Sequence, residues 1–300
     1  MSSHTIDPLY EGRGIPVALS EVEQALDQLW GPAAEKAGGP EVDQPVVTRV
    51  ALANVVVVQL GAPRLGLEQT IAAITTQYPS RLIVLRPQEE GDRSLSAEVS
   101  AQCHLPAPGR PQVCSELIIL RATQEGRSLL AGAVRSLVES DLHSVLWWCD
   151  DPRESPELFE QLAGEATRVI LDLPDPATAP EALAVAEQLD RHSLARDMAW
   201  FGLTSWRGLI ADLFDPPATC DLNRLAAIRV RVLAEAEDRP PRAACWLIAW
   251  LAGQLGWQPD EKPRSERPGQ FEVTFRSAVG TIAVAIEVER SEVGLFAQIA

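Results

Sequence analysis

Four aspartates follow two stretches that have the composition of buried strands, and they are the residues best suited to acid–base chemistry. Asp150 and Asp151 end one stretch, and Asp172 and Asp175 lie at the end of the next. Because ligands of open α/β sheets bind at the carboxyl ends of strands, these carboxylates could form one site. Paired carboxylates can act as general acid and base or hold a cation, although neither pair has a neighbouring histidine or third carboxylate. Aspartate before proline is also typical of turns, which is the structural alternative.

The strand that leads to Asp150 contains two adjacent tryptophans, Trp147 and Trp148, in a chain with only 5% aromatic residues. Neighbouring strand residues point to opposite faces, so one tryptophan fills a core layer while the other meets a helix or a partner. Cys149 lies beside Asp150 and Asp151, and their negative charge is expected to raise its pKa. A raised pKa argues against a nucleophilic role for this thiol.

Two further cysteines are placed symmetrically about a predicted turn. Leu95–Leu105 and Val113–Ala122 have the pattern of an antiparallel hairpin centred on Pro108-Gly109. In that hairpin Cys103 and Cys114 lie directly opposite each other, where Cβ atoms are about 4.5–5.5 Å apart, only slightly beyond disulfide geometry. Two small buried residues and a redox-sensitive pair both remain compatible with this placement.

A second tryptophan-rich segment carries Trp200, Trp206 and Arg207, and Thr204 is the predicted N-cap of the helix that follows. Arg207 then lies in the first helical turn, where the helix dipole disfavours a cation. This suggests a specific task, either an ion pair with a strand-end aspartate or contact with a partner. Tryptophan and arginine are enriched at interface hot spots, but large aromatic residues also dominate ordinary cores.

The sequence signatures of common catalytic sites are missing. Gly12-Arg13-Gly14 has no third glycine at the required spacing and follows no strand, so it is not a dinucleotide fingerprint. The chain has neither a phosphate-binding loop nor a nucleophile elbow. Its four histidines belong to no cluster with metal-ligand spacing. We therefore expect no bound metal, no cofactor and no intrinsic dehydrogenase activity.

Composition points to a soluble protein with an acidic surface. The net charge is −16, from 26 basic and 42 acidic residues, which argues against nucleic acid and anionic membranes and allows a partner with a basic patch. Residues 1–10 show no secretory signal, and no apolar run reaches the roughly 18 residues that span a bilayer. Five irregularly spaced cysteines form no secreted disulfide framework, so a reducing cytoplasm is the expected location.

The order of predicted elements divides the chain into three parts. Residues 1–45 comprise a helix, Ser20–Trp30, with Ser20 as its N-cap, and a linker. Residues 46–217 form an α/β domain with a mixed sheet that begins with a strand from Val46 to Leu60. Residues 218–300 form a smaller α+β domain, in which a strand and a helix precede an antiparallel meander of three strands.

Five segments carry a resemblance to a known family. They read SVLWWCDDP, RVILDLPDP, DMAWFGLTSWRGLIADLFD, IRVRVLAEAE and AACWLIAWLAGQLGW. Together with the opening helix they resemble OpcA, a family of glucose-6-phosphate dehydrogenase assembly proteins, over most of the chain from about Ser20 onward. The most specific element is Thr204-Ser205-Trp206-Arg207 with Trp200 upstream.

The resemblance implies a non-catalytic assembly factor and activator that binds glucose-6-phosphate dehydrogenase and supports NADPH production in the oxidative pentose phosphate pathway. The resemblance implies no catalytic residues. Some members of the family are associated with thiol redox control, but the resemblance does not assign that control to particular cysteines of this chain. The residues expected to bind the partner or support its interface are Trp147, Trp148, Asp150, Asp151, Trp200, Thr204, Trp206 and Arg207. The alternative is a small-molecule-binding enzyme that uses the acidic strand ends of the α/β domain.

Overall fold

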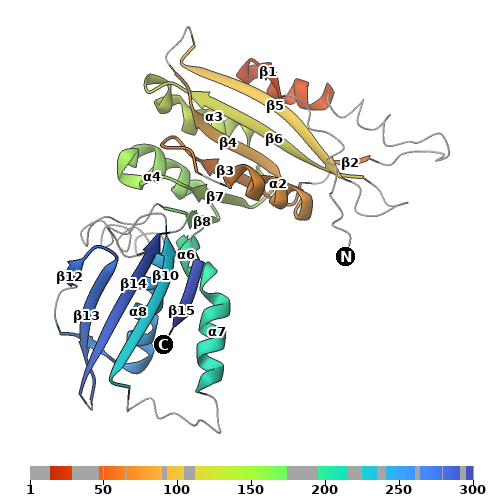
Figure 1. The fold of residues 1–300 in the computed structure, drawn as a ribbon. Coiled ribbons are helices and arrows are strands. Elements are labelled where there is room, and N and C mark those ends of the chain that lie inside the picture. Colours follow the sequence, from red (N-terminus) through yellow and green to blue (C-terminus); the bar gives the residue numbers. More distant parts are fainter. Residues whose placement is uncertain are drawn as a thin grey trace. The chain divides into compact units, whose positions relative to one another are not determined.

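The structure is a computed structural model in which the chain divides into two compact units, Met1–Asp172 and Leu173–Ala300 (Figure 1). It describes residues 14–28, 47–49, 51–64, 66–89, 93–104, 112–173, 195–214, 225–234, 241–260, 264–278, 280–290 and 295–299. The spacing of Leu183, Ala186 and Leu189 predicts an amphipathic helix over residues 180–191, which lies outside the described residues. Trp30 and Asp175 also lie outside them. No helix in the described ranges is both long enough and apolar enough to cross a membrane.

The first unit is an α/β unit built on a mixed sheet, which confirms the predicted fold class. Its strands lie in the order β1 (Ile15–Val17), β5 (Leu95–His104), β6 (Gln112–Ala122), β4 (Arg81–Pro87), β3 (Asn54–Val58), β7 (Ser144–Trp148) and β8 (Arg168–Leu171), and β2 (Val47–Arg49) pairs with β6. The strands from β6 to β8 are parallel, whereas β1 and β5 are antiparallel to their neighbours. The parallel strands are apolar runs that are mostly buried, as expected for strands covered on both faces.

Helices connect the parallel strands. They are α2 (Leu67–Gln77), η2 (Glu125–Leu129), α3 (Leu130–Leu137), η3 (Pro152–Glu154) and α4 (Pro156–Glu165), whereas η1 (Leu19–Glu21) and the helical residues 22–28 follow β1. The β3–α2–β4 segment is a unit of strand, helix and parallel strand. Before α2 the backbone turns at Gly66, whose φ of 80° would be strained for a residue with a Cβ atom.

A buried arginine joins four elements of the first unit. Arg81, at the start of β4, donates Nε to Glu116 on β6 at 2.6 Å and Nη1 to Glu23 at 2.7 Å. It also donates to the carbonyl oxygen of Leu137 at the end of α3 and pairs with Glu139. Glu23 belongs to the N-terminal helix, whose Val22 and Leu26 are fully buried. The N-terminal helix is therefore fixed to the body by both packing and charge.

Two local predictions in this unit were wrong. The valine-rich stretch from Val46 to Leu60 forms two strands, because the chain leaves the sheet around Leu52, whose N–H donates to Pro79 O. Ser20 is not an N-cap: a 3-10 turn begins at Leu19, and its N-cap residue is Ala18. Residue composition indicates neither the break between β2 and β3 nor the start of the 3-10 turn at Leu19, because apolar residues continue through both segments.

The second unit packs a long helix against a mixed sheet. Its strands lie in the order β11 (Gln258–Pro259), β13 (Gln270–Arg276), β14 (Thr281–Arg290), β10 (Ala227–Ala234) and β15 (Leu295–Ile299), and β12 (Arg264–Arg267) pairs with β13. The helix is α8 (Arg242–Leu255), which ends at Gly256 in a left-handed conformation. The predicted meander was wrong in one connection: β15 pairs with β10, and β10 is parallel to β14.

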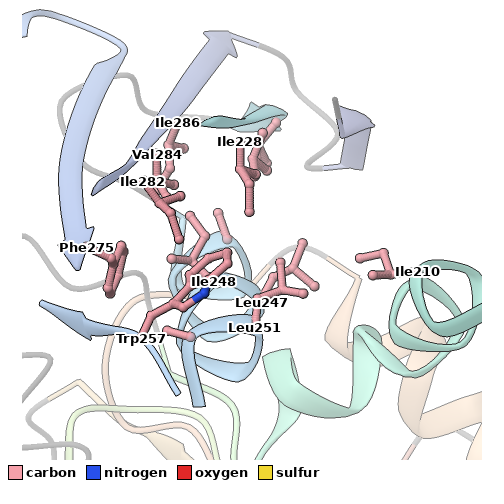
Figure 2. Packing of buried hydrophobic residues seen from close by; sticks show 14 of the residues in the cluster. Ile210, Ile228, Leu247, Ile248, Leu251, Trp257, Phe275, Ile282, Val284 and Ile286 are labelled. Atoms are coloured by element: carbon pink, nitrogen blue, oxygen red, sulfur yellow. The ribbon is translucent and has the colours of Figure 1, made fainter. Parts of the chain in front are cut away.

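Side chains from both layers of the second unit form one apolar core (Figure 2). Alternate residues of β14, such as Ile282 and Val284, point toward α8, where Leu247 and Ile248 are almost fully buried. Trp257 lies against Phe275 with ring centroids 6.1 Å apart. The sheet therefore has one apolar face, and the helix covers it, as the alternating sequence pattern indicates.

The segment before β10 also contributes to this core. It contains β9 (Ala195–Asp197), α6 (Met198–Gly202) and α7 (Thr204–Leu213). Leu203 and Ile210 are buried members of the core of the second unit. This segment therefore belongs to the second unit, Leu173–Ala300.

Candidate functional site

The carboxylate of Asp150 is turned into the protein and holds the loop that follows β3. It accepts hydrogen bonds from the backbone N–H groups of Leu60 at 2.5 Å and Gly61 at 3.2 Å. Burial raises the pKa of Asp150 above its usual range, although the two backbone N–H donors act in the opposite direction. A Cβ atom on Gly61 would lie 2.9 Å from the carboxylate, so the loop approaches Asp150 as closely as a glycine permits.

The other described strand-end aspartates also have internal partners. Asp172 pairs with Arg64 at 3.1 Å and accepts a hydrogen bond from the Trp147 indole at 3.3 Å. Asp151 is the N-cap of η3 and accepts from the backbone N–H and the guanidinium of Arg153, which lowers the pKa of that carboxyl. Asp150, Asp151 and Asp172 therefore hold the fold together at the ends of β3, β7 and β8.

This arrangement changes what the first strand-to-helix loop can bind. In dinucleotide-binding folds the backbone N–H groups after the first strand of a βαβ unit face the pyrophosphate. Here two such N–H groups, those of Leu60 and Gly61, donate to Asp150. A carboxylate therefore already occupies the position where phosphate oxygens would be expected, and its charge opposes a second anion.

The tryptophans that precede these aspartates are core residues. Trp147 is 4% exposed and Trp148 is fully buried. Trp148 packs edge-to-face on Phe159 of α4, with ring centroids 5.1 Å apart. As predicted, the two side chains lie on opposite faces of β7, and both faces are covered. Neither indole presents a surface to a partner, so any support that they give to an interface is indirect.

Cys149 has the raised pKa that the sequence predicts. Burial raises the pKa of this thiol to about 12, and the charge of Asp172 contributes in the same direction. The thiol is 2% exposed. It therefore remains protonated at neutral pH, and its environment is not that of a nucleophile.

We expect Cys149 to resist alkylation in the folded protein from pH 7 to 9, because the reactive thiolate is almost absent below its pKa. Cys245 is exposed and serves as the internal reference for the reagent. The measurement is peptide mass mapping after iodoacetamide treatment, with and without urea. Modification of Cys149 in the native protein at the same rate as Cys245 would contradict the burial of this thiol.

The segment from Trp200 to Arg207 forms a compact structure of its own. The guanidinium carbon of Arg207 lies 3.6 Å from the centroid of the Trp200 ring, a cation–π contact. Arg207 Nη1 donates to Trp200 O at 2.7 Å, and Nη2 lies 3.4 Å from the Thr204 hydroxyl. Arg207 thus joins the two helices α6 and α7. The three described strand-end carboxylates are held by other groups, so the predicted ion pair between Arg207 and one of them is not the role that this geometry supports.

Thr204 is not the N-cap that the sequence predicts. It is the first residue of α7, its hydroxyl donates to Phe201 O at 2.8 Å, and the N-cap position is Leu203. The prediction failed because α6 directly precedes α7: the N–H of Arg207 donates to Leu203 O, and that of Leu203 to Trp200 O. Trp206 is half-buried and packs against the core of the second unit.

One residue at the start of this segment was missed from the sequence. Asp197 is 2% exposed and caps α6 by accepting from the N–H of Ala199 at 2.8 Å. It also accepts from the Trp246 indole at 3.0 Å and pairs with Arg242 at 2.9 Å. Both of these partners are on α8, so Asp197 fixes the tryptophan-rich segment to the long helix. The Trp200 and Trp246 rings, 6.1 Å apart, complete the contact.

The predicted hairpin is present with the predicted register. Cys103 and Cys114 are Cα partners in the antiparallel pairing of β5 and β6. Cys114 is buried and disulfide-bonded. The backbone register therefore brings these two cysteines together, as their placement about the turn indicates.

The fold defines a class of protein in which an α/β unit is followed by an α+β unit. The strand-end carboxylates that the structure describes all make contacts within the protein. Two family models match successive parts of the chain. Residues 71–188 match the glucose-6-phosphate dehydrogenase subunit N-terminal domain, and residues 193–298 match the C-terminal domain of the same subunit. Together they span most of the chain, which belongs to the OpcA family.

Curated relatives agree with this assignment. A protein of Synechococcus elongatus, named as the OxPP cycle protein OpcA, is 28% identical over 310 residues, which cover 81% of this chain and 68% of the relative. A protein of Nostoc punctiforme with the same name is 30% identical, over 71% of this chain and 44% of the relative. The chain thus spans less than half the length of the second relative.

Two solved structures show a distant likeness to this chain. Apo scyllo-inositol dehydrogenase from Lactobacillus casei aligns with 80% of this chain and 70% of its own, at 9% identity and a TM-score of 0.45. The WlbA dehydrogenase from Thermus thermophilus aligns with 78% of this chain and 73% of its own, at 8% identity and a TM-score of 0.43. Likenesses at these scores do not indicate the site or the activity of this chain.

Proposed function

We propose that this chain is a non-catalytic assembly factor and activator that binds glucose-6-phosphate dehydrogenase in the cytoplasm and so supports NADPH production by the oxidative pentose phosphate pathway. The observation that carries the proposal is the match of both units to the two domains of a glucose-6-phosphate dehydrogenase subunit. The internal use of Asp150, Asp151 and Asp172 also supports it, because these carboxylates are then not available as a catalytic pair.

The candidate interface residues fall into two groups in this proposal. Trp147, Trp148, Asp150 and Asp151 belong to the sheet and its ends, where burial and internal contacts make them structural supports. The second group is the segment that contains Trp200, Thr204, Trp206 and Arg207, which is half-buried to exposed. We assign the direct contribution to this second segment.

Size-exclusion chromatography with light scattering tests the partner. The purified chain and glucose-6-phosphate dehydrogenase from the same organism are expected to elute together with a mass above that of either protein. Calorimetric titration of the isolated chain with NADP is the companion experiment, and no tight binding is expected because Asp150 occupies the loop donors. Separate elution at micromolar concentrations would count against the partner, and tight NADP binding would count against a non-catalytic role.

Arg207→Ala is expected to lower the stability of the second unit by about 1–2 kcal/mol, because it removes the contact with the Trp200 ring and the bond to Trp200 O. Arg207→Lys is the matched variant that keeps the charge but not the planar guanidinium. Thermal unfolding and dehydrogenase binding are measured on the same samples. A proportionate loss of both agrees with a positioning role, whereas lost binding with an unchanged melt would show that Arg207 contacts the partner itself.

We propose that Cys103 and Cys114 form a redox-sensitive pair on β5 and β6. Their opposed backbone positions and the bonded state of Cys114 support the proposal. After purification without reductant, both are expected to escape alkylation and to become reactive after dithiothreitol treatment. Alkylation of either cysteine in the native, unreduced protein would contradict the pair.

A further inference from the structure

The outward face of α7 is more apolar than that of an ordinary surface helix. Leu209 is 59% exposed and Leu213 is 69% exposed, and Phe201 at the end of α6 is 42% exposed. The two leucines are four residues apart, so they lie side by side on the helix surface. The side chains of α7 that face the core are the buried Ile210 and the half-buried Trp206, so Leu209 and Leu213 are left outside it.

Charge is also depleted on this face. The exposed residues of α7 are Thr204, Ser205, Gly208, Leu209, Ala211, Asp212 and Leu213. Asp212 is the only charged residue among them. On α4, a helix of the same length, the exposed positions include Glu157, Glu160 and Glu165 and no large apolar residue. Large apolar side chains with few charges are typical of the centre of a protein interface, whereas α4 has the composition of a solvated face.

The segment that carries this face is held in place from within. Asp197 caps α6 and pairs with Arg242, and Arg207 joins α6 to α7 through Trp200. Phe201, Leu209 and Leu213 are thus presented on a fixed support, which lowers the entropy lost on binding. One explanation therefore accounts for both features: Arg207 positions the helix, and Leu209 and Leu213 contact the partner.

We propose that the outward face of α7, with Phe201, is the surface on which this chain docks glucose-6-phosphate dehydrogenase; this rests on the function proposed above. The complementary surface on the dehydrogenase is an apolar groove that accepts one helix face and has a basic side chain near Asp212. A second copy of this chain fits the face less well, because each copy carries a net charge of −16 and the two would repel.

The test compares the double variant Leu209→Ser and Leu213→Ser with Leu129→Ser. Leu129 is 51% exposed but belongs to η2 of the other unit, so it is a matched control for removing an exposed leucine. The double variant is expected to raise the Kd for the dehydrogenase at least about 30-fold, as for a hot-spot pair, and the control to leave it unchanged. Ser205 is exposed and lies four residues before Leu209, on the same row of the helix surface. Ser205→Glu, which adds a charge to this face, is expected to weaken binding as well.

The outcomes separate this surface from the function on which it rests. Loss of affinity in the double variant and in Ser205→Glu, with wild-type melting temperatures, supports the surface. Wild-type affinity in both of these variants would overturn the proposed surface, while the dehydrogenase would remain the partner. If the wild-type chain does not bind the dehydrogenase at all, the proposed function is wrong, and so is the assignment of the dehydrogenase to this surface. A wild-type dimer that the double variant abolishes would replace the dehydrogenase by a second copy.

Discussion

Replacing Arg81 by methionine is expected to lower the free energy of unfolding of the first unit by about 3–5 kcal/mol. The Arg81 side chain is 2% exposed and that of Glu116 is 4% exposed, so the substitution leaves a buried carboxylate without its closest cation. It also removes the donor to Leu137 O and the link to Glu23 on the N-terminal helix. Urea unfolding measures the loss, and amide hydrogen exchange in β4 and β6 assigns it to this unit.

Two controls show whether burial is the cause. Arg135→Ala removes an ion pair with Glu165 in which both side chains are largely exposed, so the melting temperature is expected to stay the same. The double variant Arg81→Met and Glu116→Met is expected to be more stable than Arg81→Met alone, because no buried charge is left behind. Equal destabilisation by Arg135→Ala and Arg81→Met would contradict this explanation.

Asp197→Ala is expected to destabilise the second unit by a similar amount, about 3–5 kcal/mol. The Asp197 side chain is 1% exposed and that of Arg242 is 9% exposed, so the variant leaves a buried guanidinium without its carboxylate. The same change removes the cap of α6 and the acceptor of the Trp246 indole. Thermal unfolding followed by near-ultraviolet circular dichroism reports on the tryptophans directly.

Asp197→Asn is the conservative partner of this experiment. It keeps one carbonyl oxygen, which can still cap α6 by accepting from Ala199, but it lacks the negative charge that faces Arg242. An intermediate loss of stability is therefore expected. If Asp197→Ala melts at the wild-type temperature, the contact between α8 and the tryptophan-rich segment does not hold that segment in place.

Local patterns predicted much of the fold from the sequence. The turn between β5 and β6 and the alternation on either side of it were enough to place Cys103 opposite Cys114. Pro241 and Gly256 limit α8 because proline is tolerated before a helix and glycine adopts the left-handed conformation after it. In both cases the information lies within a few residues of the feature that it predicts.

What the sequence did not predict depends on contacts between distant residues. β15 follows β14 in the sequence but lies on the far side of β10 in the sheet, and the residue types of β15 do not indicate which strand it pairs with. In the sequence Asp197 has no feature that distinguishes it from a turn residue, because its partners Trp246 and Arg242 lie on the distant helix α8. The spacing of Leu209 and Leu213 indicates an apolar helix face but does not say whether the core or a partner covers it.

The rate of glucose-6-phosphate dehydrogenase, measured as NADPH formation while this chain is added stepwise, is the most direct test of the proposed function. A rate that rises and saturates at a fixed ratio of the two proteins is expected, with no NADPH formed by the chain alone. A rate that is unchanged at every ratio, under conditions in which both proteins are folded, would contradict the account.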